Sequence, residues 1–204
     1  MLYQYANQKV VTQLRKECET ILKGVQKEVS EFFTFQFYLI GSGEKKLVTQ
    51  GCDGYFDLDY NLVLMSDKQG LASDPKRVKD IFIKAFNDVA PKLGFSFAKN
   101  STSVITSKHA DGDNHFSFDC AIVAEGNNGN FYKIVFDKPD RYIWNEIKHT
   151  KDFNAKFQFL RANGYLDEIK KLYLKKKNAN RSGASSFAIL SQTVNEIVQE
   201  YGSQ

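Results

Sequence analysis

The chain has 204 residues, of which 42% are hydrophobic and 14% aromatic, and it contains only three prolines. This composition is ample for a packed core and excludes a mainly disordered chain. The net charge of +4 is unevenly spread, because residues 148–204 hold ten Lys or Arg against five Asp or Glu. Two interpretations of that basic excess stay open: a solvated helical surface, or a surface that meets a polyanion.

The first third of the chain predicts one helix and two strands. In residues 10–32, apolar side chains recur at spacings of three and four, as in an amphipathic helix. The stretch FTFQFYLIGSG, residues 33–43, predicts a strand that runs into a Gly-Ser-Gly turn. Residues 55–65 form the next predicted strand, and the unbroken run of Leu62, Val63 and Leu64 predicts that both of its faces are covered.

A second helix and three further strands follow. The helix is predicted over residues 73–94, since a Ser-Asp cap and Pro75 precede its apolar stripe and Gly94 ends it. Strands are predicted within 95–107, 115–125 and 130–137, joined by turns at KHADGDN and GNNG.

From residue 141 onward the pattern predicts helices only, over 141–164, 165–178 and 184–201. The order of elements predicts an α+β fold, with a mixed β-sheet and flanking helices in residues 1–140. Residues 141–204 are then expected to form a separate helical region.

Two carboxylates share one face of the strand predicted at 55–65. Asp57 and Asp59 lie two residues apart, which places their side chains about 7 Å apart along that face. Like charges at this spacing repel each other, and partial burial adds to the repulsion unless a divalent cation such as Mg²⁺ binds. The alternative is a polar strand edge that faces solvent.

Asp119 is the acid on the polar face of HFSFDCAIV, so it joins Asp57 and Asp59 if the two strands are neighbours. The alternative is a lone exposed Asp. At the end of the first strand, Gly41 allows a tight turn and Ser42 offers a hydroxyl to an anion. A plain glycine turn is the alternative there.

Taken together, these features resemble the nucleotidyltransferase superfamily that includes DNA polymerase β. Its pattern is a strand ending in hG[GS], where h is apolar, then Dh[DE]h about a dozen residues later and a third carboxylate on a later strand. This sequence matches with Ile40-Gly41-Ser42, with Asp57-Leu58-Asp59-Tyr60 and with Asp119. The match covers roughly residues 10–140, and the fourteen residues between Ser42 and Asp57 stand at the long end of the usual gap.

The resemblance implies an enzyme that transfers a nucleoside monophosphate. An acceptor hydroxyl would attack the α-phosphorus of a nucleoside triphosphate such as ATP and release pyrophosphate. Asp57, Asp59 and Asp119 would be the catalytic residues and the ligands of Mg²⁺ or Mn²⁺, while Gly41 and Ser42 would bind the nucleotide phosphates. Residues 1–140 would be the catalytic core and 141–204 would close the cleft. Lysines within 170–177 would contact the triphosphate, or else form a solvated helix end.

The acceptor stays open between a small molecule, a second nucleotide, an RNA 3′ end and a protein hydroxyl. A second hypothesis is an oligo- or cyclic-nucleotide synthase of the same superfamily. A third is a non-catalytic module that binds nucleotides or RNA.

No signal peptide is recognisable in the first seventeen residues, and no apolar run approaches the roughly 20 residues of a membrane-spanning helix. The three cysteines, Cys18, Cys52 and Cys120, form no CxxC pair and are typical of a reducing compartment. We therefore expect a cytoplasmic protein without membrane partners.

Overall fold

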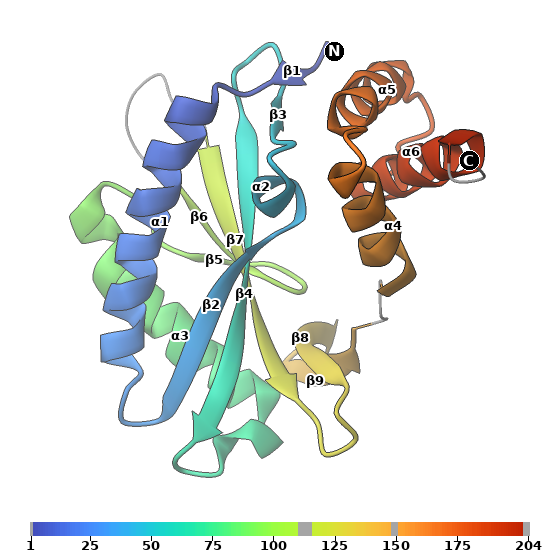
Figure 1. Ribbon diagram of the computed structural model, residues 1–204. Helices are drawn as coiled ribbons and strands as arrows, with labels where there is room; N and C mark the ends of the chain where they lie inside the picture. Colours follow the sequence, from blue (N-terminus) through green and yellow to red (C-terminus); the bar gives the residue numbers. More distant parts are fainter. Residues whose placement is uncertain (1, 110–115, 148–150, 202–204) are drawn as a thin grey trace. The chain divides into compact units, whose positions relative to one another are not determined.

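The computed structural model describes residues 2–109, 116–147 and 151–201. The chain forms two compact units (Figure 1). The core unit comprises Ala6–Val48 and Asp53–Ile147, and the C-terminal unit comprises Met1–Tyr5, Thr49–Cys52 and Lys148–Gln204.

The core unit is built on a seven-stranded sheet in the order β2-β4-β7-β6-β5, in which β8 pairs with β7 and β9 with β8. Its central pair, β4 and β7, is parallel, and the other pairs are antiparallel. The strands are β2 (Phe33–Ile40), β4 (Phe56–Asp67), β5 (Lys99–Asn100), β6 (Ile105–Lys108), β7 (Phe116–Glu125), β8 (Phe131–Lys138) and β9 (Arg141–Glu146).

Two helices, α1 (Gln8–Glu28) and α3 (Pro75–Val89), pack on one face of this sheet (Figure 1). Asn7 caps α1 by accepting from the Lys9 backbone N–H, and Asp74 caps α3 by accepting from that of Arg77. Each helix buries one apolar stripe, as its sequence period predicts. The stripes consist of Val11, Leu14, Cys18, Ile21, Leu22 and Val25 on α1, and of Val78, Phe82, Ala85 and Phe86 on α3.

Alternation along β4 and β7 decides which side chains meet these helices. Phe118 and Cys120 of β7 and Leu58 and Tyr60 of β4 are buried in the core. The residues between them therefore lie on the opposite face of the sheet. The prediction that both faces of β4 are covered is wrong, because Asp57 and Met65, on the same face as Val63, are exposed.

The first residues of the helix predicted over 141–164 form a strand instead, β9, which pairs with β8. Tyr142 and Trp144 both pack against the core, and the Trp144 indole Nε1–H donates to the Ala72 carbonyl at 2.7 Å. A short apolar run such as Tyr142, Ile143 and Trp144 fits either period, so only pairing with β8 decides between them.

Smaller differences concern the loops. The first predicted strand ends at Ile40, and Gly41–Lys45 forms a short helix, α2. The turn predicted at 108–114 lies mostly outside the described residues.

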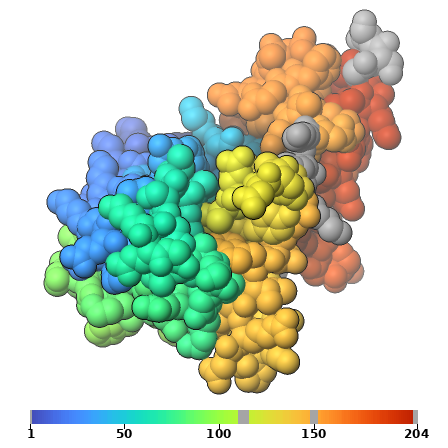
Figure 2. Space-filling model, turned by 90° about the horizontal axis from the view of Figure 1, so that it is seen from below, coloured from blue at the N-terminus to red at the C-terminus, as the bar shows by residue number. Residues whose placement is uncertain are grey.

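Figure 2 shows the core unit from the end at which β4 finishes. The segment between β4 and α3 (blue-green) and the β7–β8 turn (yellow) lie at the surface in this view.

The C-terminal unit contains α4 (Lys151–Ala162), α5 (Leu166–Ala179) and α6 (Ser186–Tyr201), together with β1 (Gln4–Tyr5) paired with β3 (Thr49–Gln50). The Tyr3 backbone N–H donates to Asn178 at 2.6 Å, and the Tyr5 hydroxyl donates to the Lys170 carbonyl at 2.8 Å. These bonds join β1 to α5. Among the described residues, none of the helices has the length and apolar character needed to cross a membrane.

Candidate active site

The parallel register of β4 and β7 brings the three predicted carboxylates together. Asp59 pairs with Asp119, and Asp57 pairs with Ser117, one step along the same two strands. Neighbouring strands are about 4.8 Å apart, and paired residues of parallel strands project from the same face. Asp57, Asp59 and Asp119 are thus adjacent on the face of the sheet opposite the helices.

Asp57 is held by a buried hydroxyl. Ser117 is only 1% exposed, and its Oγ–H donates to Asp57 Oδ1 at 2.6 Å. The Tyr55 hydroxyl lies 2.7 Å from Ser117 Oγ. Burial and the nearby Asp57 carboxylate raise the pKa of Tyr55 to about 12. Tyr55 therefore stays protonated at neutral pH and remains a hydrogen-bond donor.

Asp119 has a comparable partner on the next strand. Thr106 of β6 is its register neighbour, and the Thr106 hydroxyl donates to Asp119 Oδ1 at 2.5 Å. Burial raises the pKa of Asp119, while the Thr106 hydrogen bond opposes that rise. The Asp57 charge adds to the rise and the Lys108 ammonium counteracts it.

Asp59 stands between these two and differs from both. Within the described residues, no donor hydrogen-bonds to its carboxylate. Burial raises its pKa from 3.8 to about 6, and the charges of Asp119 and then Asp57 add to the effect. Asp59 is therefore the carboxylate of this cluster whose charged form a bound cation would stabilise most.

The glycine turn predicted from the sequence meets the carboxylates at the same corner of the sheet. Gly41 has a φ of +63°, and a Cβ there would lie 3.2 Å from Asp59 Oδ2. A side chain at this position would thus be strained and crowded. Ser42 follows in the first turn of α2 and is half-buried.

The donor set suits a hard divalent cation, because Mg²⁺ and Mn²⁺ prefer carboxylate oxygens. In the ranges that the structure describes, however, no three His, Cys, Asp or Glu side chains are already arranged to hold a metal ion. The unpaired, half-buried Asp59 between two further carboxylates still fits a cation, since only positive charge relieves this repulsion.

Three polar residues of this corner were missed by the sequence analysis: Tyr55, Thr106 and Ser117. Ser117 lies two residues before Asp119, so strand alternation places it on the same polar face, which was the available signal. Thr106 belongs to the stretch STSVIT, where nothing distinguishes it from the other hydroxyls. Their partners are up to sixty-two residues away, so only the folded sheet identifies them.

The lysines predicted to contact phosphate lie in α5, in the C-terminal unit. Lys170 is 3.6 Å from an Asp167 oxygen, Lys176 pairs with Glu196, and Lys177 Nζ donates to the Thr49 hydroxyl at 2.6 Å. At least these three have partners within their own unit. Their contact with a triphosphate stays a prediction.

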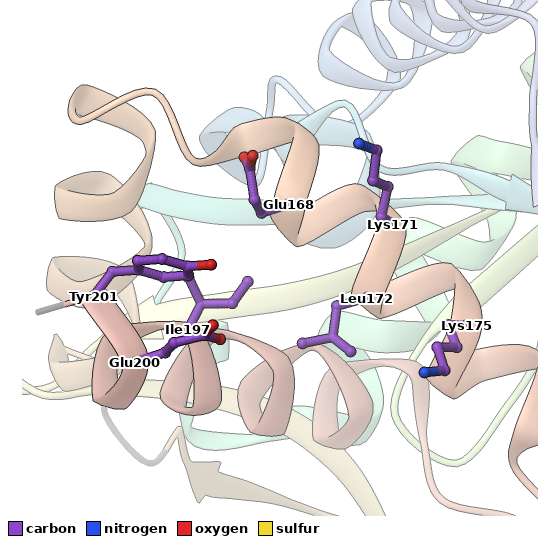
Figure 3. A pocket seen from close by; sticks show the side chains of 7 residues that line it. All are labelled: Glu168, Lys171, Leu172, Lys175, Ile197, Glu200 and Tyr201. Carbon is purple, nitrogen blue, oxygen red and sulfur yellow. The ribbon is translucent and has the colours of Figure 1, made fainter.

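A pocket of about 280 Å³ lies between α5 and α6, also within the C-terminal unit (Figure 3). Leu172 points from α5 toward α6, whereas Glu168 and Lys171 project away from α6 in this view. Its charges are balanced in sign, and it contains no counterpart of the carboxylate cluster. Its lining consists of Glu168, Lys171, Leu172, Lys175, Ile197, Glu200 and Tyr201.

Solved structures with a similar fold include a CD-NTase and a cyclic AMP-GMP synthase. The CD-NTase CdnG of Bradyrhizobium diazoefficiens, in complex with GTP, is 15% identical with a TM-score of 0.54, over 83% of this chain and 48% of its own. The GTP-bound form of Vibrio cholerae DncV is 15% identical with a TM-score of 0.56, over 88% of this chain and 51% of its own. The same DncV is a cyclic AMP-GMP synthase, and its complex with the linear intermediate 5′ pppA(3′,5′)pG is 13% identical with a TM-score of 0.57. That match covers 80% of this chain and 47% of the DncV chain.

No family model matches the chain, and no curated protein is significantly similar to it. The structural similarity confirms the predicted fold class: a nucleotidyltransferase-like mixed sheet with flanking helices and further helices toward the C-terminus. The chain spans about half the length of the solved structures that it matches.

Proposed function

We propose that this chain is the catalytic core of a metal-dependent nucleotidyltransferase that joins nucleotides into an oligo- or cyclic nucleotide. The observation that carries the proposal is the cluster of Asp57, Asp59 and Asp119 on the face of β4 and β7 opposite the helices, next to the Gly41 turn. The second of these carboxylates is half-buried and accepts no hydrogen bond from the described residues, as expected of a cation ligand.

The fold similarity to a cyclic AMP-GMP synthase favours a nucleotide as the acceptor. Transfer to a small molecule, to a protein hydroxyl or to an RNA 3′ end has no structural counterpart among these similarities. The triphosphate is accordingly proposed to be ATP or GTP, since the similar structures include GTP-bound forms and a form with bound 3′-deoxy ATP.

In the proposed reaction, a ribose hydroxyl oxygen of one nucleotide bonds to the α-phosphorus of a second. The bond from that phosphorus to the oxygen bridging toward the β-phosphorus breaks, and its electron pair leaves with pyrophosphate. The hydroxyl proton passes to Asp119, whose pKa is raised by burial and which can release the proton to solvent afterwards. Thr106 keeps the Asp119 carboxylate oriented during this transfer.

Asp57, Asp59 and Asp119 would hold the divalent ions. When bound, Mg²⁺ or Mn²⁺ supplies charge neutralisation of the triphosphate and of the attacking and leaving oxygens. The chain's own contribution is to orient carboxylates toward that position and to keep the Gly41 backbone free of a side chain beside Asp59. Ser42 would donate its hydroxyl to the nucleotide phosphates.

The proposal is tested by incubating the purified chain with ATP, GTP, CTP and UTP, singly and in pairs, with MgCl₂ or MnCl₂. Products are separated by anion exchange and identified by mass spectrometry. We expect pyrophosphate release and a 5′-triphosphate dinucleotide or cyclic product. Asp57→Asn and Asp119→Asn should lower the rate by about a hundredfold or more, the usual loss for one electrostatic catalytic group.

Asp88→Asn is the matched control, because Asp88 is a surface residue paired with Lys84 on α3. Its rate should equal that of wild type. Absence of pyrophosphate release from every nucleotide, in a folded sample, overturns the enzymatic proposal. Nucleotide binding without turnover would instead favour a non-catalytic binding module.

A further inference from the structure

We infer that Thr106 and Ser117 are positioning residues, whose hydroxyls hold Asp119 and Asp57 in the orientation that binds a divalent cation. This inference rests on the proposed function, because it concerns how the same site holds its metal. It adds two residues outside the carboxylate motif to the determinants of metal affinity.

The hydrogen bonds at Asp57 have a defined direction. Ser117 has one hydroxyl proton, and it donates that proton to Asp57 Oδ1 at 2.6 Å. The bond of 2.7 Å between Tyr55 and Ser117 must then run from the Tyr55 hydroxyl to Ser117 Oγ. Tyr55, Ser117 and Asp57 form a directed chain, in which each group fixes the orientation of the next.

The Asp119 side has a shorter version of the same arrangement. Thr106 is paired with Asp119 in the β6–β7 register, and its hydroxyl donates to Asp119 Oδ1 at 2.5 Å. The β-branched Thr side chain has few rotamers, so the donor is itself fixed in direction. Hydrogen bonds from a hydroxyl to a carboxylate are among the stronger ones in proteins.

The contrast with Asp59 shows why these hydroxyls matter. Asp57 and Asp119 are each held through Oδ1, whereas Asp59 between them has no hydrogen-bond donor among the described residues. The repulsion from Asp59 would rotate its two neighbours away if nothing held them. The two hydroxyls therefore keep the outer carboxylates beside the central one in the absence of a cation.

Partners that orient metal ligands in this way typically contribute a factor of about 10 to 100 in metal affinity. We therefore expect Thr106→Val, which keeps the shape of the side chain and removes only the hydroxyl, to raise the Mn²⁺ dissociation constant by about 10-fold or more. Thr106→Ser, which restores the hydroxyl, should return it to within about threefold of wild type. Ser117→Ala should act like Thr106→Val.

The experiment is a titration of each variant with MnCl₂ alone, followed by calorimetry and by the electron paramagnetic resonance signal of free Mn²⁺. Thr34→Val is the matched control, because it removes a hydroxyl from a 2.7 Å bond to Ser66 elsewhere on the same sheet. Its Mn²⁺ affinity should equal that of wild type. Since Ser117 is buried, Ser117→Ala can fail to fold, and Tyr55→Phe then provides a second test of the hydrogen bonds at Asp57.

Turnover separates positioning from a general loss of structure. The positioning variants should need more Mn²⁺ for half-maximal rate yet approach the wild-type rate at saturating Mn²⁺. Wild-type Mn²⁺ affinity in both Thr106→Val and Ser117→Ala overturns the inference. If wild type binds Mn²⁺ but releases no pyrophosphate, the proposed function fails while the affinity comparison still decides the positioning. A wild-type chain that binds no Mn²⁺ overturns both.

Discussion

Replacing Asp59 by Asn should stabilise the protein at neutral pH when no divalent cation is present. Asp59 is half-buried and has Asp57 and Asp119 as neighbours, so its charge is unfavourable in the folded state. Asn keeps the shape of the side chain and removes that charge. Such a gain in stability is what distinguishes a cation-binding carboxylate from one that supports the fold.

The size of this gain in the free energy of unfolding follows from the pKa of Asp59, which rises from 3.8 to about 6 on folding. The folded state keeps its proton to a higher pH than the unfolded chain, so the wild type loses stability as pH rises through this interval. The shift corresponds to at most about 3 kcal/mol, and partial solvent screening lowers our expectation to about 2 kcal/mol. The advantage of Asp59→Asn should therefore be absent near pH 4, grow up to about pH 7 and stay constant above it.

The assay is urea unfolding of wild type and Asp59→Asn in EDTA, at several pH values between about 4.5 and 8. The difference between the two free energies of unfolding is compared across pH, which removes any pH-independent effect of the amide. Asp88→Asn should stay within about 0.5 kcal/mol of wild type at every pH, as expected for an exposed ion pair. A difference for Asp59→Asn that is flat with pH, or that favours wild type increasingly above pH 6, refutes the reasoning.

Three other outcomes are expected. Gly41→Ala should destabilise the protein by about 1–2 kcal/mol in urea unfolding and lower nucleotide turnover, because the φ of +63° disfavours a side chain. Lys79 is 1% exposed, and burial lowers its pKa to about 8. As the pH rises from about 8 to 10.5, wild type should therefore gain stability relative to Lys79→Met, as measured by thermal unfolding. Cys52 is exposed, so it alone should react quickly with Ellman's reagent in the native protein, and all three thiols should react in denaturant.

Long periodic segments were predictable because their pattern already contains the packing face. The six buried positions of α1 and the capped start of α3 at Asp74 are examples. Short segments were not. The run Tyr142-Ile143-Trp144 became β9 only because the edge of β8 was free to pair with it and Trp144 could reach the Ala72 carbonyl.

The candidate site, too, was predictable only where local sequence decided it. Asp57 and Asp59 could be assigned to one strand face from their spacing alone, since alternation is a local property of an extended chain. Whether Asp119 lies beside them depended on the pairing of β4 with β7, which is a contact between residues sixty positions apart. No sequence feature distinguishes its partner Thr106 from the neighbouring hydroxyl residues.

The sequence by itself determined which residue types stand on which face: three carboxylates on polar faces, a glycine turn at the end of a strand, and apolar stripes behind them. Their chemistry, as oxygen ligands that repel one another without a cation, follows from those residue types. The tertiary structure alone decided which carboxylates are held by a hydroxyl and which one is not. That distinction arises because hydrogen bonds depend on distances between strands, and register is set by the packing of the whole sheet rather than by any one segment.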